Sequence, residues 1–328
     1  MLGILALVGL GVGLTALLLN DGDDDDAAVA AGPRITSDDD DLVFDQGFRP
    51  GISEGLTDLV AEGEITQAEA DAILGDIDFV SGAQNLDTRA GDDVVVLLQG
   101  DNKIETGDGD DMVLSGTGAD NVNLGSGDDV YGTDTRVIHR DDDEQSFPDP
   151  EDAISVGDAP VRGDDLEQGN DTVAGGAGDD AISDNFGANL INGQQGDDFI
   201  VSVDDARDLG TADTVKGGSG QDTLIVDEGD LVTTGAGADQ VVIETYSGVV
   251  DGYDLITITD FIAGQDALSV QGDAELLRPG SNGTSPVSLQ ELDDESGTLV
   301  LINGIPVAHL LGVQGLSPSQ IEVRIDNR

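Results

Sequence analysis

Cysteine and tryptophan are both absent from this chain of 328 residues, and aromatic residues make up only 3% of it. Without cysteine there can be no disulfide, no thiolate metal site and no thiol catalysis. Without bulky aromatic anchors an ordinary globular core is difficult to build, so the interior must consist of small aliphatic side chains. Any additional stability must then come from bound ions.

Basic residues are also scarce. The chain has 12 Lys and Arg against 69 Asp and Glu, which gives a formal net charge of -57 at pH 7. A surface with this charge repels the phosphate backbone of DNA and RNA and every anionic membrane surface. Nucleic acid is therefore excluded as a partner.

The chain opens with its longest apolar run, which extends from Leu2 to Leu19 without a charged residue. As a helix this run would span roughly 27 Å, which is marginally enough to cross a bilayer. It has neither a basic start nor a small-residue cleavage site, because the acidic cluster 21–26 follows almost directly. We therefore expect residues 1–19 to form an uncleaved transmembrane helix that anchors the protein to a membrane, with a cleaved signal segment as the alternative.

The next segment, residues 20–50, is acidic and lacks a period, so it is expected to be a solvated linker. Residues 51–80 show helical spacing and a capping box from Thr66 to Glu69, which predicts a short helical hairpin. Ser53 lies in a G-x-S-x-G sequence, but no buried strand precedes it, so it is interpreted as a helix N-cap. No catalytic residue is assigned.

Forty-seven glycines together with abundant aspartate would normally indicate disorder, but here these residues recur every nine positions. Five units follow one another without a gap from Thr88 to Gly132, within a first repeat block at 85–132. Further units, such as GGAGDDAIS from Gly175 and GGSGQDTLI from Gly217, fill residues 166–242. The sequence therefore predicts a stacked repeat architecture.

The residue types in each unit have a physical reason. Glycines at the second and fourth positions can adopt backbone angles that are forbidden to other residues, so the chain turns sharply and presents carbonyl oxygens. The aspartate at the sixth position adds an anionic oxygen beside them. Calcium requires about six to eight oxygen ligands, which no single turn supplies, so two stacked turns have to share an ion.

These units resemble the hemolysin-type calcium-binding repeat, or RTX family, with the consensus G-G-x-G-x-D-x-U-x in which U is a large aliphatic residue. The resemblance implies an all-β parallel β-roll or β-solenoid in which two units form one coil and several Ca2+ ions bind between coils. Units eighteen residues apart then share an edge. Asp93, Asp111 and Asp129 would line one edge, opposite Asn102 and Asp120, and Asp180 and Asp198 would pair opposite Asp171 and Asn189.

The resemblance assigns calcium binding to the turn glycines and to the aspartates at the sixth position. These residues are Asp93, Gly107, Gly109, Asp111, Gly116, Gly118, Asp120, Gly125, Gly127, Asp129, Gly169, Asp171, Gly176, Gly178, Asp180, Gly196, Asp198, Asp213, Gly218, Gly220, Asp222, Gly235, Gly237 and Asp239. Sites at which asparagine replaces the aspartate, as at Asn102 and Asn189, should be weaker or vacant.

The residue at the eighth position follows the turn and is expected to point inward, so that together these residues form the core. They are Val95, Ile104, Val113, Val122, Tyr131, Val173, Ile182, Ile191, Ile200, Val215 and Leu224. An acidic insertion at 133–165 with three prolines breaks the register and is expected to be a loop.

Residues 243–328 contain an I-x-D-F-x-x-G-x-D-x-L motif that is similar to the closing segment of RTX proteins. Its fixed positions are Ile258, Asp260, Phe261, Gly264, Asp266 and Leu268. We expect a β-rich cap for the end of the solenoid, with a hairpin at Asn303-Gly304 and a last strand at 321–325. The resemblance also implies a signal for export in about the last 50 residues.

The function expected from these features is that of a non-enzymatic, secreted or surface-displayed calcium-binding module, whose repeats fold when ions neutralise their aspartates. A cell-surface adhesin or polysaccharide binder is the alternative, although few aromatic residues are available for such a surface. An unrecognised carbohydrate-modifying enzyme is a third possibility. A zinc protease site is excluded, because neither His139 nor His309 belongs to an H-E-x-x-H motif.

Overall fold

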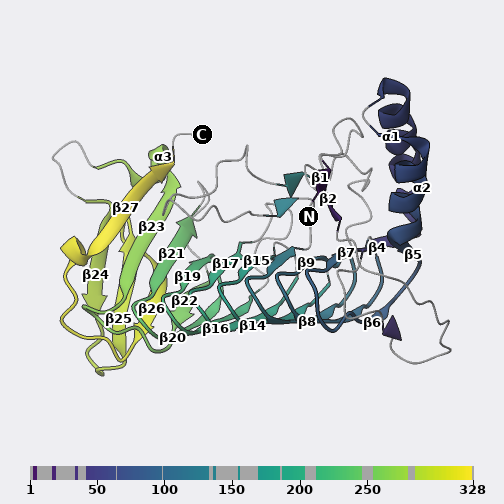
Figure 1. The fold of residues 1–328 in the computed structure, drawn as a ribbon. Helices are drawn as coiled ribbons and strands as arrows, with labels where there is room; N and C mark the ends of the chain where they lie inside the picture. Colours follow the sequence, from purple (N-terminus) through teal and green to yellow (C-terminus); the bar gives the residue numbers. More distant parts are fainter. Residues whose placement is uncertain are drawn as a thin grey trace. The chain divides into compact units, whose positions relative to one another are not determined.

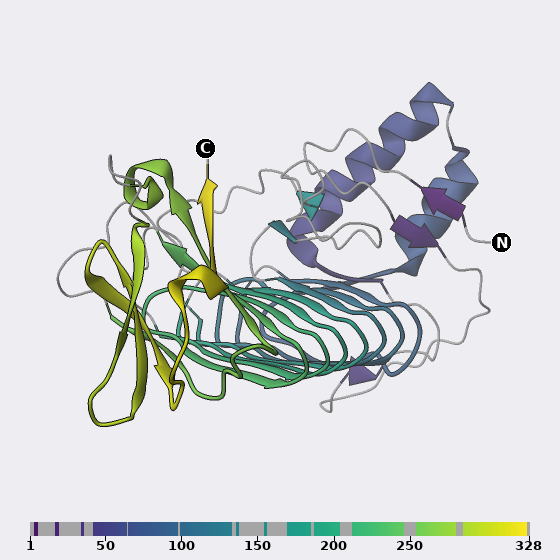
Figure 2. The same cartoon turned by 90° about the vertical axis from the view of Figure 1, so that its left-hand side faces the viewer.

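The computed structural model describes residues 3–5, 17–19, 34–35, 42–63, 65–97, 99–132, 136–137, 154–155, 169–184, 187–203, 212–245, 254–279 and 285–326. The chain forms two compact units, Met1–Thr172 and Val173–Arg328. In each unit short strands alternate between two mainly parallel sheets, so that the chain winds in successive coils (Figures 1 and 2). The expected parallel β-roll is confirmed.

The first unit winds with a period of eighteen residues, because in its register Ile104 lies opposite Val122 and Val95 lies opposite Val113. Two nine-residue units therefore make one coil. One sheet contains, in spatial order, β3 (Arg34–Ile35), β6 (Asn85–Asp87), β8 (Lys103–Asp108) and β10 (Asn121–Ser126). The other contains β5 (Ile77–Val80), β4 (Leu42–Asp45), β7 (Val94–Val96), β9 (Met112–Leu114) and β11 (Val130–Gly132).

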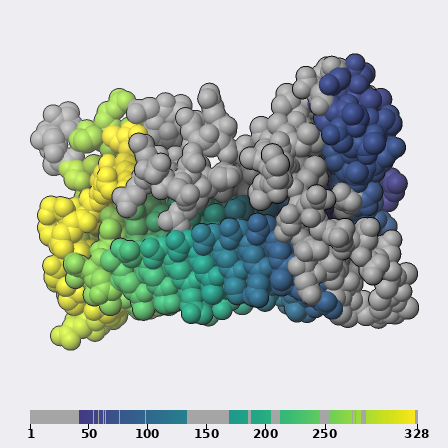
Figure 3. Space-filling view, in the orientation of Figure 1, coloured from purple at the N-terminus to yellow at the C-terminus, as the bar shows by residue number. Residues whose placement is uncertain are grey.

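The second unit repeats this arrangement and ends in the C-terminal module. Its first sheet contains β14 (Thr172–Ala177), β16 (Leu190–Gln195), β18 (Thr214–Ser219), β20 (Leu231–Ala236), β22 (Ile256–Ile258), β26 (Ile305–Leu311), β25 (Gly297–Ile302) and β24 (Val287–Glu291). Its second sheet contains β15 (Ala181–Asp184), β17 (Phe199–Ser202), β19 (Thr223–Val226), β21 (Gln240–Thr245), β23 (Ala267–Asp273) and β27 (Ile321–Asp326). In the space-filling view of Figure 3 the colours of the second unit change from teal through green in the order of the chain.

The core of each coil consists of the residues at the eighth repeat position, as expected. All eleven are buried, and none exposes more than 1% of its surface. Most are Val, Ile or Leu, so each coil contributes only a thin apolar layer. Burial of this core alone therefore gives each coil limited stability, since the apolar area removed from water per residue is small.

A helical hairpin covers one outer face of the first unit. It consists of α1 (Arg49–Glu62) and α2 (Gln67–Asp76), and the expected capping box at Thr66 and Glu69 is present. Ser53 is not an N-cap, because α1 begins at Arg49 after Phe48, with a proline in its first turn. Ser53 instead lies within the helix, where its carbonyl accepts a hydrogen bond from Thr57 Oγ1.

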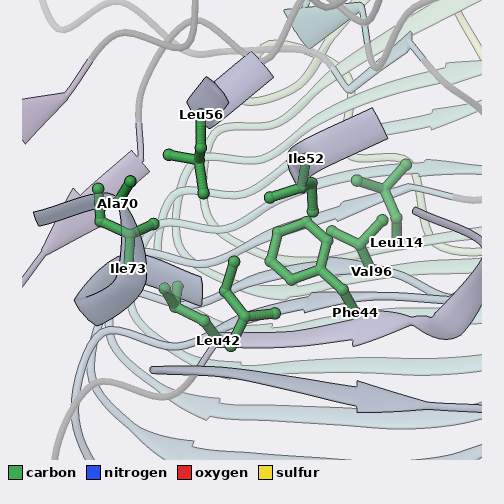
Figure 4. Close-up of a cluster of buried hydrophobic side chains, with 9 residues drawn as sticks. Leu42, Phe44, Ile52, Leu56, Ala70, Ile73, Val96 and Leu114 are labelled. Atoms are coloured by element: carbon green, nitrogen blue, oxygen red, sulfur yellow. The ribbon is translucent and has the colours of Figure 1, made fainter. Parts of the chain in front are cut away.

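The hairpin packs on a cluster of buried apolar side chains (Figure 4). β4, which supplies part of this cluster, lies within the expected linker 20–50, yet it pairs in parallel with both β5 and β7. The reason is its apolar sequence Leu42-Val43-Phe44, which is fully buried. Val43 points into the coil, and its neighbours Leu42 and Phe44 point to the hairpin, because successive side chains alternate across a sheet.

The expected transmembrane helix is not supported. Within 1–19 the structure describes only β1 (Gly3–Leu5) and β2 (Leu17–Leu19), which pair antiparallel, and residues 6–16 lie outside the described part. Among the residues that the structure describes, no helix is long and apolar enough to cross a membrane. Several glycines in this run lower its helix propensity.

The expected insertion at 133–165 lies mostly outside the described residues, apart from β12 (Arg136–Val137) and β13 (Ile154–Ser155), which pair antiparallel. In the C-terminal module the expected hairpin is confirmed, since Asn303 and Gly304 have φ values of 52° and 87° between β25 and β26. The last strand, β27, pairs in parallel with β23. A short helix, α3 (Ala274–Leu277), and two 3-10 turns, η1 (Gln46–Phe48) and η2 (Pro318–Gln320), complete the described elements.

Two leucines on strands that are consecutive in the chain test the importance of the thin core. Leu224 in β19 is fully buried, whereas Leu231 in β20 exposes 43% of its surface. We expect Leu224→Ala to lower the free energy of unfolding by about 2 to 5 kcal/mol, and Leu231→Ala to change it by no more than about 0.5 kcal/mol. Urea unfolding in saturating calcium measures both. Equal losses for the two variants would show that the inward ladder is not the core.

Candidate metal-binding turns

The turns between the two sheets are held open by glycine. At the fourth repeat position Gly109 has a φ of 137°, and a Cβ placed on it would overlap the carbonyl oxygen of Gly91 in the preceding coil. The second repeat position also has a left-handed backbone. At this position Arg89 and Gln194 have φ values of 77° and 82°, although they are not glycine. Left-handed backbone is disfavoured for such residues, so these two turns carry some strain.

The aspartates at the sixth position form a ladder along each edge of the roll. In each step the backbone N–H of one residue donates to Oδ1 of its equivalent in the next coil, as from Asp93 to Asp111 and from Asp111 to Asp129, both at 2.8 Å. The opposite edge has the step from Asn102 to Asp120 at 2.8 Å. The edge assignment expected from the sequence therefore agrees with the hydrogen bonds.

The same ladder runs through the second unit. Asp180 donates to Asp198 and Asp198 donates to Asp222, both at 3.0 Å. Asp222 in turn donates to Asp239 at 3.0 Å. On the other edge Asn189 donates to Asp213 at 2.6 Å. Each carboxylate thus uses one oxygen to join two coils.

The second carboxylate oxygen has no such role in several of these turns. Among the described residues, Oδ2 is buried and has no hydrogen-bond partner in Asp111, Asp120, Asp198, Asp222 and Asp239. Each of these residues exposes 2% or less of its surface. A buried anionic oxygen without a donor is strongly unfavourable, so something other than the described protein groups must neutralise it.

Glycine at the first repeat position leaves space beside this oxygen. A Cβ added to Gly193 would overlap Asp198 Oδ2 and lie 2.7 Å from the carbonyl oxygen of Gly217 in the next coil. Gly175 and Gly217 border Asp180 and Asp222 in the same way. At Asp198 and Asp222 the unpartnered carboxylate oxygen and a carbonyl oxygen of the neighbouring coil therefore converge on one point.

Burial also changes the acidity of these aspartates. Desolvation raises the pKa of Asp111, Asp120, Asp129 and Asp198 to about 7, and that of Asp222 to about 6. Neighbouring carboxylates add to the shift, such as Asp222 beside Asp198. Without a cation, ionising these groups at neutral pH therefore works against the fold.

The residues present fit a hard cation such as Ca2+. The groups that converge beside Gly193 and Gly217 are carboxylate and carbonyl oxygens, and the sequence has no cysteine to supply a thiolate. Within the described part of the chain no three His, Cys, Asp or Glu side chains are grouped closely enough to hold a metal ion. The main-chain oxygens of the turns would therefore have to supply much of the coordination.

Two turns, each on the edge opposite to the Asp111 or Asp198 ladder of its own unit, satisfy their aspartates from within the protein. Tyr131, which stands at an aliphatic position, directs its hydroxyl to Asp171 Oδ2 at 3.1 Å and to Ser115 Oγ at 2.9 Å. Ser202 donates to Asp213 Oδ2 at 2.5 Å. These aspartates were expected to bind calcium, and their position in the turns agrees with the repeat pattern. Their outer oxygens, however, already accept hydrogen bonds.

One aspartate of the closing motif continues a ladder, and a second binds the backbone at the start of the last repeat; the sequence pattern indicated neither contact. Asp239 donates its N–H to Asp266 Oδ1 at 3.3 Å, so Asp266 acts as the next step after the last repeat. Asp260 accepts hydrogen bonds from the N–H groups of Thr234 and Gly235 at 2.8 and 3.0 Å. Asp266 thus supplies the acceptor that the sixth position of a further repeat would have supplied.

Comparison with known proteins agrees with this geometry. The family model of the RTX calcium-binding nonapeptide repeat (4 copies) matches residues 80–113, 87–122, 98–131, 167–200 and 208–241. The chain therefore carries RTX repeats, and the resemblance in the sequence is confirmed. No curated protein matches the chain.

Among solved structures, the chain is similar to the extracellular lipase LipA from Serratia marcescens, with 16% sequence identity and a TM-score of 0.24. The similarity covers 90% of this chain but only 40% of that protein.

The raised pKa values predict how the calcium-free protein responds to pH. A carboxyl group whose pKa is higher in the folded state stabilises the fold below its unfolded value near 4, and this stability is lost as the pH rises through about 7. In EDTA we expect the β signal in far-UV circular dichroism to be stronger at about pH 5.5 than at about pH 8. Saturating calcium should remove most of this difference. A calcium-free signal that strengthens as the pH rises would contradict the burial of these groups as ionisable acids.

Proposed function

We propose that this protein is a non-catalytic calcium-binding module that acts outside the cell, and that its coils become ordered when calcium binds between them. The observation that carries this proposal is the buried Oδ2 of Asp198 and of Asp222, each of which has no donor among the described residues and lies beside a carbonyl oxygen of the next coil. The turn glycines and sixth-position aspartates of the repeats would hold the ions. An ion shared by two coils would neutralise their carboxylates and couple their folding.

The proposed extracellular location rests on the RTX repeats, because the resemblance to that family implies export. Extracellular calcium modules typically bind in the range of about 10⁻⁴ to 10⁻³ M, a concentration that the cytosol does not reach. The high negative charge of the chain favours an unfolded state inside the cell, where calcium is scarce. Folding would then follow export, and an export signal in about the last 50 residues stays a prediction.

The absence of catalysis is part of the proposal. Neither His139 nor His309 belongs to an H-E-x-x-H motif, so the sequence offers no zinc site of this kind. Ser53 lies inside α1 on the outer face of the first unit, and not on a strand-to-helix turn such as a serine nucleophile requires. The proposed role therefore rests on structure and binding alone.

A calcium titration of the full chain tests the proposal directly. We expect a transition to β structure in far-UV circular dichroism with a midpoint at roughly 10⁻⁴ to 10⁻³ M calcium. Magnesium should be far less effective, because it prefers rigid octahedral coordination with retained water. A spectrum that does not change, or an equal response to magnesium, would contradict the proposal.

One glycine allows a sharper test of the turn geometry. Gly193→Ala places a Cβ between Asp198 Oδ2 and Gly217 O, in the space expected for the ion, and Gly193 has no left-handed φ that would add strain. We expect the variant to bind one ion fewer per chain, as measured by equilibrium dialysis. Gly75→Ala in α2 is the control, since a Cβ there has no atom within 4 Å. Unchanged calcium binding by the Gly193 variant would place the ion elsewhere.

A further inference from the structure

One turn of the first unit contains an amide where its counterparts carry a free carboxylate oxygen. Asn102 occupies the sixth repeat position, is 3% exposed and takes part in the ladder like an aspartate. Its Oδ1 accepts the N–H of Gln84 at 2.9 Å. This contact fixes the orientation of the amide, because exchanging its oxygen and nitrogen would place two donors opposite each other.

The amide nitrogen of Asn102 then faces three acceptors. Nδ2 lies 2.8 Å from the carbonyl oxygen of Gly100, 3.1 Å from that of Ser115 and 2.9 Å from Asp120 Oδ1. Gly100 stands at the fourth position of the same turn, Ser115 at the first position of the next coil and Asp120 at its sixth. The two N–H groups of this nitrogen are therefore shared among three acceptor oxygens from two coils.

The turn at Asp198 in the second unit has the same groups in the same repeat positions, but no donor. Asp222 Oδ1 is its ladder partner, the carbonyl oxygen of Gly217 lies beside the space next to Gly193, and Asp198 Oδ2 has no hydrogen-bond partner among the described residues. Where Asp198 presents an anionic oxygen that requires a cation, Asn102 presents a neutral N–H donor.

The first repeat position of the Asn102 turn differs as well. It is Leu97, which is buried at 3% exposure, whereas the Asp198 turn has Gly193. Because a Cβ at this position intrudes on the space beside the sixth side chain, Leu97 fills part of the volume that glycine leaves open. Both residues that shape the space for an ion are therefore changed in the same turn.

We propose that the amide nitrogen of Asn102 takes the place of a calcium ion, so that the coil pair at residues 97–120 is joined without calcium. The inference rests on the proposed function, since it assumes that calcium fills the equivalent space in the Asp198 turn. Asn102 is thus a positioning residue, and its turn is an ion-independent link at which ordering of the roll can begin before calcium binds.

The proposal is tested by converting the Asn102 turn into a turn that should bind calcium. The double variant Leu97→Gly with Asn102→Asp restores the pattern of the Asp198 turn, and we expect it to bind one calcium ion more per chain than the unaltered protein in equilibrium dialysis. Leu97→Gly alone is the control and should bind the unaltered number. The proposal is overturned if the double variant binds the same number of calcium ions as the unaltered protein. It is also overturned if the double variant fails to fold in saturating calcium while Leu97→Gly folds.

The converse variants keep the proposal testable if Leu97→Gly itself prevents folding. Asp198→Asn and Asp198→Ala both remove a charge, so both should bind one ion fewer. Only the asparagine supplies donors, so only this variant should protect the backbone amides of residues 193–200 from hydrogen exchange in EDTA. Equal protection in the two variants would show that loss of charge, and not the amide, orders the turn, and the proposal would fail.

The proposed calcium binding and the proposed role of Asn102 can be tested separately. If the unaltered protein takes up no calcium, the proposed function is wrong. If it takes up calcium but the variants show neither the added ion nor the amide-dependent protection, the proposed function stands and only the role of Asn102 is wrong.

Discussion

The structure depends on one constraint, which is that every coil buries a carboxylate and the carboxylates of successive coils are stacked. Each Oδ1 is satisfied by the N–H of the preceding coil, as in the step from Asp198 to Asp222. The second oxygen of Asp198 has no donor in the described part of the chain. Burial of such a charge is unfavourable without a partner, so the ladder that aligns the coils also creates the requirement for a cation.

Because the apolar core is thin, its burial does not offset the cost of burying carboxylates without a cation. The inward residues are mostly Val, Ile and Leu, and aromatic residues form only 3% of the chain. Apolar burial per coil is therefore modest, while ordering each residue costs roughly 1 to 2 kcal/mol of backbone entropy. A net charge of -57 opposes compaction further. Because each coil contacts only its neighbours, an ion that bridges two coils stabilises them at the point where cooperativity arises.

The sequence alone predicted the parts of the fold that follow from the nine-residue period. The period placed Val95, Ile104 and Leu224 in the core and assigned Asp93 and Asp111 to a shared edge, because each unit repeats the same geometry. It could not place β4, since Leu42-Val43-Phe44 is a short apolar run after an aspartate cluster and its partner β7 lies about fifty residues further on. Long-range pairing of this kind leaves no local signal.

The nine-residue period could not predict in which turns a protein group donates a hydrogen bond to the second carboxylate oxygen. The sixth position alone suggested that Asp171 binds an ion, but the hydroxyl that reaches it belongs to Tyr131, forty residues earlier. Likewise, asparagine at position 102 indicated a weak or vacant site, whereas the three contacts of its Nδ2 were visible only in the structure. Which group fills the space beside a ladder aspartate depends on side chains from two coils.

The residue at the first repeat position is the other determinant of each turn. Glycine at position 193 leaves the carbonyl oxygen of the next coil without a side chain in front of it. In the first unit, threonine hydroxyls donate to the corresponding carbonyl oxygens, from Thr88 to Thr106 at 3.0 Å and from Thr106 to Leu124 at 2.6 Å. A hydroxyl that already occupies this acceptor competes with an ion for it. The residues at the first and sixth positions together therefore decide which oxygen atoms each turn can offer to an ion.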